Sequence, residues 1–467
     1  MKANQIIDAL GEVEEEKIEK ATRKKLNDKK PRKNNKRFIA LVASFVLIFA
    51  SYGLLTRKVN NNDIYALAKA SYPSISDYPK EEEYFNEKTG EFDPSYDEKY
   101  EKWKSDQVKL EVKNQDYDIK YKDFLRNNLE SFFQEVKDER VFSPLNFYLA
   151  SSMLTELVDG QTRDELSSLL EEPSMESLRE NTRELWLTNY QDDGRYSSIL
   201  ANSIWLKEGE NYNKELLDLL GENYYASIFA GDVYDPNYSK KFRQWIDEST
   251  KGILKDMTKD QRINPDTVVK LVSTIYFNDS WQDEFYEGKT KKDIFYGPKG
   301  EIEVNFMYQS LENHKYYRGS GFSAIQKPLK EAGDVWFILP NKDKKPEDII
   351  GSKDLLDMVL EEEEYKNKKD YKINLSLPRF DVKSDLDLIP ILRQNGVNKV
   401  FNPGEANFSP LGEFDNPLYV SEFKHAARVK IDEKSVTAAA YTVIGIEKSK
   451  MPEESEEVDF IVNRPFI

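Results

Sequence analysis

The chain has 467 residues, enough for one large domain with appended segments. It contains no cysteine and two histidines, which excludes disulfides, iron–sulfur clusters and thiolate zinc sites and leaves little for metal chemistry. Its 68 basic and 85 acidic residues give a formal net charge of −17, and so acidic a protein repels nucleic acid. We therefore expect no cofactor, no metal and no nucleic-acid partner.

The N-terminal part has the pattern of a membrane anchor. Basic residues crowd positions 23–37, and residues 38–55 then carry no charge. As a helix this run is about 27 Å long, close to the roughly 30 Å of a bilayer core. The positive-inside rule predicts residues 1–37 as a cytoplasmic basic tail, a single transmembrane helix at 38–55, and the rest of the chain outside.

Two alternatives to the anchor are a cleaved signal peptide and a basic nucleic-acid-binding arm. The long basic leader and the long apolar run disfavour a signal peptide, and the adjacent apolar run explains the basic residues better than a nucleic-acid partner does. The leader also resembles the short cytoplasmic leaders of single-pass proteins from Gram-positive bacteria. Residues 56–116 are rich in Tyr, Glu, Asp and Lys and are interpreted as an acidic, aromatic-rich juxtamembrane spacer, or as a partly ordered extension held by aromatic side chains. These aromatic residues are Tyr78, Tyr84, Phe85, Phe92 and Trp103.

From residue 117 onward, helical and strand patterns are mixed without a regular βαβ alternation, which predicts an α+β domain at 117–467. Helical segments are expected at about 213–226, 239–249 and 353–363, after a first helix marked by Leu125, Leu129, Phe132, Phe133 and Val136. Strands are expected at 202–206, 268–277, 335–339 and 371–378.

Local signals also place two helix starts. Ser143 can cap a helix whose first turn contains Pro144, and Gly160 can end that helix. Thr162 and Glu165 then have the spacing of a capping box before the next helix.

Residues 435–446 have the pattern of a strand without proline or charge. With a period of two, one face carries only small or apolar residues, namely Val436, Ala438, Ala440, Thr442, Ile444 and Ile446. Asp432–Lys434 precede the run, and charged residues follow it. Composition alone would favour an ordinary buried strand.

The surrounding sequence resembles that of the serpin family. Residues 425–440 are similar to the hinge of a serpin reactive-centre loop, and Arg464-Pro465-Phe466 is similar to the motif that follows this loop. Four further segments carry the resemblance in the same order along the chain: Phe142-Ser143-Pro144-Leu145-Asn146, the strand 268–281 that ends in Trp281, Leu377-Pro378-Arg379-Phe380, and 396–401.

The resemblance implies a serpin fold, with three β-sheets, about eight or nine helices and an exposed loop, preceded here by the transmembrane helix. It implies a protease inhibitor, not an enzyme, and we expect a monomer without cofactors at the cell membrane, with the serpin domain extracellular. The partner would be a target protease of the serine type, trypsin-like or subtilisin-like, with cysteine proteases left open. A protease would cleave the loop, form an acyl-enzyme and be carried along as the freed strand inserts into the central sheet.

The resemblance also assigns site residues. The loop hinge is Glu433, Ser435, Val436, Thr437, Ala438, Ala439 and Ala440. Ser143, Asn146, Ser273 and His425 would form a polar cluster where the sheet opens, and Trp281 would lie where the loop enters the sheet. His314 is expected at the surface. The scissile region is Lys448, Ser449 and Lys450, because counting from Glu433 gives Ser449–Lys450 and a one-residue shorter hinge gives Lys448–Ser449.

This sequence departs from the family pattern in several places. The hinge has Ser435-Val436-Thr437 where the family usually has Gly-Thr-Glu, and Tyr441 replaces a typical Ala. The loop is longer than usual and acidic. After Phe466 the family continues with two buried strands, so the domain is expected to be C-terminally incomplete, as a fragment or a truncated gene product.

Two other functions are alternatives. A non-inhibitory serpin-like binding or chaperone module is opposed by the uncharged, proline-free hinge. An extracytoplasmic hydrolase is opposed by the absence of Gly-x-Ser-x-Gly, His-Glu-x-x-His and P-loop motifs from the sequence.

Overall fold

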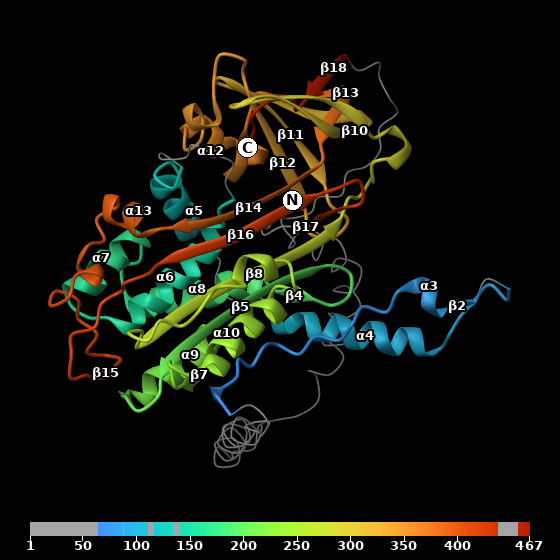
Figure 1. Cartoon of the computed structure of the whole chain (residues 1–467). Coiled ribbons are helices and arrows are strands. Elements are labelled where there is room, and N and C mark those ends of the chain that lie inside the picture. The colour runs from blue at the N-terminus through green and yellow to red at the C-terminus, as the bar shows by residue number, and fades with distance from the viewer. Residues whose placement is uncertain (1–63, 87, 111–115, 134–140, 438–455) are drawn as a thin grey trace, which may run out of the picture. The chain divides into compact units, whose positions relative to one another are not determined.

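Figure 1 shows the computed structural model of the chain, in which the described residues are 64–86, 88–110, 116–133, 141–437 and 456–467. Those from Tyr65 onward belong to one compact unit. None of the helices within these ranges is long and apolar enough to cross a bilayer, and the segment predicted to do so, 38–55, lies outside them.

The larger sheet runs through the middle of the domain, with its strands in the order β1-β7-β5-β8-β17-β16-β14 and β4 paired to β5 (Figure 1). All neighbours are antiparallel except β5 and β7. The bounds are β1 Ala66–Ala68, β4 Gln191–Asp192, β5 Ser197–Lys207, β7 Ala226–Gly231, β8 Val269–Ser280, β14 Phe380–Asp387, β16 Lys424–Ile431 and β17 Ser435–Thr437. The shortest inner strand, β17, separates the ends of two long ones, β8 and β16.

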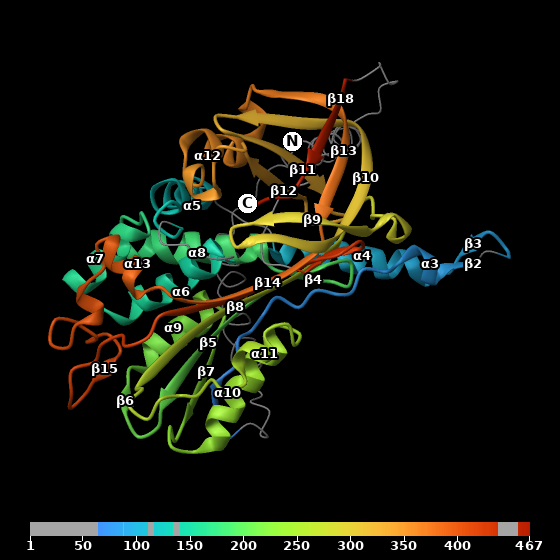
Figure 2. The same ribbon diagram turned by 45° about the horizontal axis from the view of Figure 1, so that its top comes forward.

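Helices cover both faces of this sheet (Figure 2). On one face α6 lies almost entirely buried under β8, and on the other face α10 packs on β5 and β8 through an aromatic cluster that includes Trp205 and Phe242. The bounds are α5 Asp116–Asn128, α6 Pro144–Leu157, α7 Gln161–Leu169, α8 Met175–Asn189, α9 Lys214–Asn223, α10 Pro236–Ser249, α11 Lys255–Thr258, α12 Lys353–Leu360 and α13 Ile389–Gln394.

The start of α6 follows the prediction, since the Ser143 hydroxyl oxygen accepts the N–H of Asn146 at 3.2 Å and Pro144 is the first helical residue. The predicted capping box is wrong. Gly160, at φ +57°, is the N-cap of α7, and the Glu165 carboxylate instead accepts the backbone N–H groups of Asn398 and Lys399 at 2.7 and 2.8 Å.

The second sheet has the order β12-β11-β10-β13-β18, with β9 paired to β10. β18 is parallel to β13, and Ile467 exchanges two backbone hydrogen bonds with Ile338 of β12. The bounds are β9 Lys291–Gly297, β10 Gly300–Gly319, β11 Phe322–Pro328, β12 Asp334–Pro340, β13 Lys368–Pro378 and β18 Glu457–Ile461. Two further pairs are β6 Asn211–Tyr212 with β15 Gly412–Glu413, and β2 Phe85–Asn86 with β3 Glu91–Phe92.

The described part of the segment interpreted as a spacer packs against the domain. β1 extends the large sheet beside β7, and the ring of Tyr72 stacks on Trp186. The Trp103 indole N–H donates to Asp193 at 2.9 Å. The α3 Glu81–Tyr84, β2–β3 and α4 Ser95–Gln107 part extends away from the large sheet in both views.

Candidate functional site

Three hinge residues lie inside the large sheet as β17. Val436 is paired with Asp279 of β8 on one side and with Ile431 of β16 on the other. Its side chain is 3% exposed and belongs to the core cluster between the two sheets. Thr437 is half-buried on the opposite face. The alternation expected for residues 435–446 therefore begins in the predicted phase, with Val436 inward and Thr437 outward.

The turn before β17 is fixed through Glu433. The side chain of Glu433 is buried, and its carboxylate accepts a hydrogen bond from the Thr290 hydroxyl at 2.9 Å. The Arg379 guanidinium lies 3.6 Å from the other carboxylate oxygen, and the Phe285 N–H donates to the Glu433 carbonyl at 2.9 Å. These contacts set where the hinge starts to enter the sheet.

Trp281 lies beside this turn, as the resemblance implies. Its indole N–H donates to the Asp432 carbonyl at 2.9 Å, and its backbone N–H donates to the Lys434 carbonyl at 2.9 Å. The ammonium of Lys327, a fully buried residue, lies 5.1 Å from the centroid of the Trp281 ring. Burial lowers the pKa of Lys327 to about 8. The Trp281 ring is therefore held by its hydrogen bond to Asp432 and by its contact with the Lys327 ammonium.

Further down the sheet, the four predicted polar residues come together around the start of α6. The Ser143 N–H donates to Nε2 of His425 at 3.0 Å. The Asn146 amide donates to the Ser273 carbonyl at 3.2 Å, and the Ser273 hydroxyl donates to the Asn146 side-chain oxygen at 3.3 Å. The cluster therefore links α6 to β8 through Asn146 and to β16 through Ser143.

Burial lowers the pKa of His425 to about 4. An acceptor role for Nε2 requires the neutral ring, so the hydrogen bond from Ser143 and the lowered pKa are consistent. The second histidine, His314, was expected at the surface, and this is wrong. It is half-buried on β10 with Nε2 against the Gln326 carbonyl, and burial lowers its pKa as well.

Below β17 the sheet is open. Among the described residues, β8 from Val269 to Phe277 pairs only with β5, and β16 from Lys424 to Val429 pairs only with β14. The space between these edges is part of a cavity of about 760 Å³ with a floor that includes Asn146 and Phe147 of α6. Two strand edges with backbone groups free to pair, separated by a cavity, can accept an additional strand.

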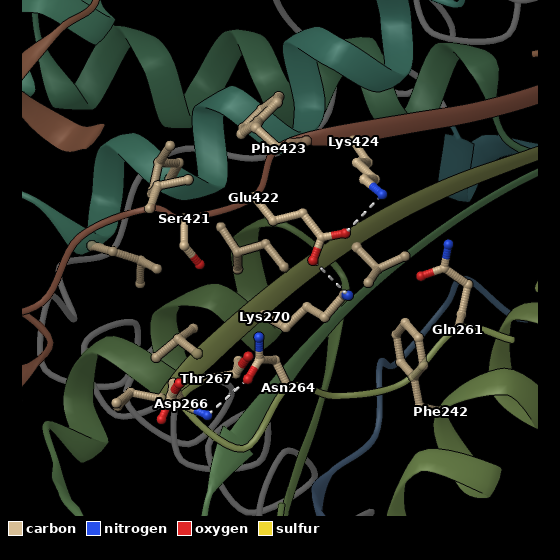
Figure 3. A pocket seen from close by; sticks show the side chains of 18 of the residues that line it. Phe242, Gln261, Asn264, Asp266, Thr267, Lys270, Ser421, Glu422, Phe423 and Lys424 are labelled. Carbon is tan, nitrogen blue, oxygen red and sulfur yellow. Dashed lines mark hydrogen bonds and ion pairs between the residues drawn. The ribbon is translucent and has the colours of Figure 1, made fainter. Parts of the chain in front are cut away.

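Figure 3 shows the charged side chains at the end of this opening that is farthest from β17. Lys270 of β8 lies 3.3 Å from Glu422, which comes two residues before β16, and Glu422 also lies 3.5 Å from Lys424. The ammonium of Lys270 is 5.1 Å from the centroid of the Phe242 ring of α10.

Comparisons with known proteins agree with this arrangement. The family described as Serpin (serine protease inhibitor) matches residues 122–467. The chain belongs to the serpin family. An uncharacterized serpin-like protein of Thermococcus kodakarensis is 25% identical over 354 residues, covering 74% of this chain and 78% of the relative. Human serpin B4 is 26% identical over 370 residues, covering 72% and 90%. The crystal structure of the thermophilic serpin tengpin in its native state aligns with a TM-score of 0.64 and 25% identity, covering 76% of this chain and 91% of tengpin.

Serpins are generally protease inhibitors and not enzymes, and the α+β fold expected from the sequence is the serpin fold. Several serpin site residues that the resemblance assigns lie outside the described residues, namely Ala438, Ala439, Ala440, Lys448, Ser449 and Lys450.

The sequence missed other residues around the serpin hinge. Arg379 was noticed only as part of a signature, and Thr290 carries no local signal of its contact with Glu433. Lys270 and Glu422 are 152 positions apart, so their ion pair also has no local signal. A charged residue in a strand otherwise rich in apolar residues is the one feature that could have drawn attention to Lys270.

Proposed function

We propose that this serpin is anchored in a bacterial cell membrane by residues 38–55, with its serpin domain extracellular, and that it inhibits serine proteases by loop cleavage and insertion. Cysteine proteases are the second target class. The observation that carries the proposal is β17, which already lies between β8 and β16 above an open gap.

Extending the register of β17 gives the insertion a specific geometry. Val436 faces Asp279 and Ile431, so a strand continuing in this register would place Thr442 between Ser273 and His425. Thr442 would bring a hydroxyl to the polar cluster of Ser143, Asn146, Ser273 and His425 on the inward face of the gap. Residues 435–448 would span about 45 Å at ~3.3 Å per residue, which would move an attached protease the length of the sheet.

The proposal is tested with the full chain in detergent micelles. We expect trypsin-like or subtilisin-like enzymes to form a complex that survives SDS. In this complex the protease should be covalently bonded to the loop residue at the cleavage site. The matched control is the same protease with its nucleophilic serine replaced by alanine, which binds the loop but cannot form an acyl-enzyme.

A second measurement separates inhibition from ordinary cleavage. Nicking within Lys448–Lys450 should raise the thermal unfolding temperature, because the freed strand would pair both open edges and bury Ile444 and Ile446 at roughly 1.5–3 kcal/mol each. An unfolding temperature that stays constant or falls would favour the non-inhibitory binding or chaperone module, and peptidase activity without complex formation would favour the hydrolase.

A further inference from the structure

Lys327 of β11 is a buried cation near the turn that leads the hinge into the sheet. Its side chain is fully buried, and its ammonium donates to the Asp283 carbonyl at 2.8 Å and to the side-chain oxygen of Gln309 at 2.6 Å. Both oxygens are neutral, so neither hydrogen bond supplies a counter-charge. Burying an ammonium is costly, and an apolar residue of similar size usually fills such a place at least as well. The stability of the core therefore does not explain why this residue is a lysine.

Two aromatic rings lie against the ammonium. Its distance is 5.1 Å from the centroid of the Trp281 ring and 4.5 Å from that of the Phe285 ring, and a cation at such distances is attracted to the ring. Both rings are buried, and they meet edge to face with their centroids 6.0 Å apart. The attraction is stronger where water is excluded, so a single charge orients both rings.

The same two residues hold the turn before β17. Trp281 donates its indole and backbone N–H groups to two carbonyls of the turn 432–434, and Phe285 donates its backbone N–H to the third, each at 2.9 Å. β17 starts at the residue that follows this turn. The contacts of Lys327 with the two rings therefore reach the start of the hinge in one step.

We propose that Lys327 is a positioning residue for the reactive loop. Its ammonium orients the rings of Trp281 and Phe285, and these residues hold the turn 432–434 where an entering strand has to start. Adding residues to a strand that is already in the sheet orders less chain than starting a new strand does. This inference rests on the proposed function, because the position of the hinge matters to inhibition only if the loop enters the sheet.

The first test locates the charge and needs no variant of Lys327. The chain has six tryptophans, so fluorotryptophan incorporated into the full chain gives six fluorine NMR signals, and Trp281→Phe identifies the signal of Trp281. Burial lowers the pKa of Lys327 to about 8, so this signal should shift with a midpoint near pH 8. A Trp281 signal that stays constant through this pH would overturn the contact.

Other titratable groups near the ammonium change charge at lower pH. The carboxyl groups are those of Asp283 and of the turn 432–434, and carboxyl groups ordinarily titrate below about pH 5. On β10 the neighbouring group is His314, and burial lowers its pKa below the model value of 6.5. A midpoint near pH 8 would therefore report Lys327.

The second test removes the charge with Lys327→Met, which keeps an unbranched side chain. Amide hydrogen exchange at Ser435–Thr437 should accelerate about three- to tenfold, the range expected for a cation–π contact shielded from water, whereas exchange in β5 should not change. The matched control is Lys99→Met, which removes a cation 4.8 Å from the centroid of the Tyr84 ring and should leave exchange at the hinge unchanged. Unchanged exchange at the hinge in Lys327→Met, or an equal acceleration in β5, would overturn the positioning role.

Phe285→Leu is a second variant that leaves the lysine in place. It removes one of the two rings, so it should also accelerate exchange at Ser435–Thr437, by less than Lys327→Met does because the Trp281 ring remains. If Lys327→Met does not fold, this variant decides, and unchanged exchange at the hinge would then overturn the role.

A third measurement separates this inference from the proposed function. With a trypsin-like protease, Lys327→Met should trap about two- to fivefold less protease in an SDS-stable complex than the unchanged protein does. Equal trapping despite faster exchange at the hinge would overturn the role in loop entry. If the unchanged protein forms no such complex, the proposed function fails, while hydrogen exchange without protease still shows whether Lys327 positions the turn.

Discussion

Val436 is the hinge residue whose replacement the structure makes most informative. Its side chain is 3% exposed in the core between the sheets, directly opposite Asp279. The carboxylate of Asp279 is itself buried, and burial raises its pKa although the N–H groups of Ser280, Glu331 and Ala332 donate to it. Any charge introduced at position 436 would therefore meet a carboxylate at close range.

Val436→Glu and Val436→Arg should differ for this reason. Both lose the burial of valine, roughly 1.5–3 kcal/mol. Glutamate adds an unpaired buried charge next to a like charge, on the order of 3–5 kcal/mol more, whereas arginine can pair with Asp279 and avoids much of that cost. We expect Val436→Glu to shift the hinge out of the sheet by about 5–8 kcal/mol in total, with a smaller effect of Val436→Arg.

The matched control is Thr437→Arg. Thr437 points outward, and its hydroxyl donates to the Asn278 side chain at 3.1 Å, so its replacement loses about 1 kcal/mol. The assay is the fraction of protease trapped in SDS-stable complex relative to inhibitor that is cleaved and released. Trapping should fall in the order Thr437→Arg, Val436→Arg, Val436→Glu. Equal trapping by Val436→Glu and Thr437→Arg would refute the inward position of residue 436 during inhibition.

His425, Glu433 and the predicted membrane anchor at 38–55 can each be tested separately. The folded-state pKa of His425, about 4, lies below its unfolded value near 6.5, so stability present above pH 6.5 should decrease as the pH falls toward 4. The free energy of unfolding should fall by about 2 kcal/mol between pH 7 and 5, and this decrease should be absent from His425→Gln. The sequence has only two histidines, so proton NMR can follow both rings, and one of them should not titrate above pH 5. Glu433→Gln removes the ion pair with Arg379, and amide hydrogen exchange at Ser435–Thr437 should accelerate about fivefold. The matched control is Glu303→Gln, which removes the 2.6 Å ion pair with Lys292 between β9 and β10 and should leave this exchange unchanged. Protease added to intact cells should digest the serpin domain and spare residues 1–37; loss of residues 1–37 alone would mean that the orientation is reversed.

Local sequence signals predicted those parts of the fold that local chemistry determines. Ser143 and Pro144 placed the start of α6 because a cap and a first-turn proline act within three residues. The expected strands at 202–206, 268–277, 335–339 and 371–378 each fall on an observed strand, since apolar runs with β-branched residues are buried in both sheets.

The failures have tertiary causes. Glu165 has the spacing of a capping-box residue, but Asn398 and Lys399 offer it two N–H donors that no local pattern reveals. His314 was expected at the surface, whereas its Nε2 lies against the Gln326 carbonyl of β11, a contact that no local pattern reveals. For the polar cluster, the sequence alone would have been insufficient, because Ser143 and His425 are 282 positions apart and only the family resemblance joined them.

The inward face of the gap explains why a neutral histidine suits this position. While the sheet is open, the Ser143 N–H donates to the Nε2 acceptor of His425 without adding charge to the interior. A protonated ring would lose that acceptor and leave a buried cation, with no carboxylate among the other members of the cluster to offset it. A strand in the register of β17 would bring the Thr442 hydroxyl to the same place, and a hydroxyl can donate or accept. The cluster can therefore stay hydrogen-bonded whether the gap is open or filled. Charged groups with fixed partners at this place would have to break a buried ion pair when the strand enters.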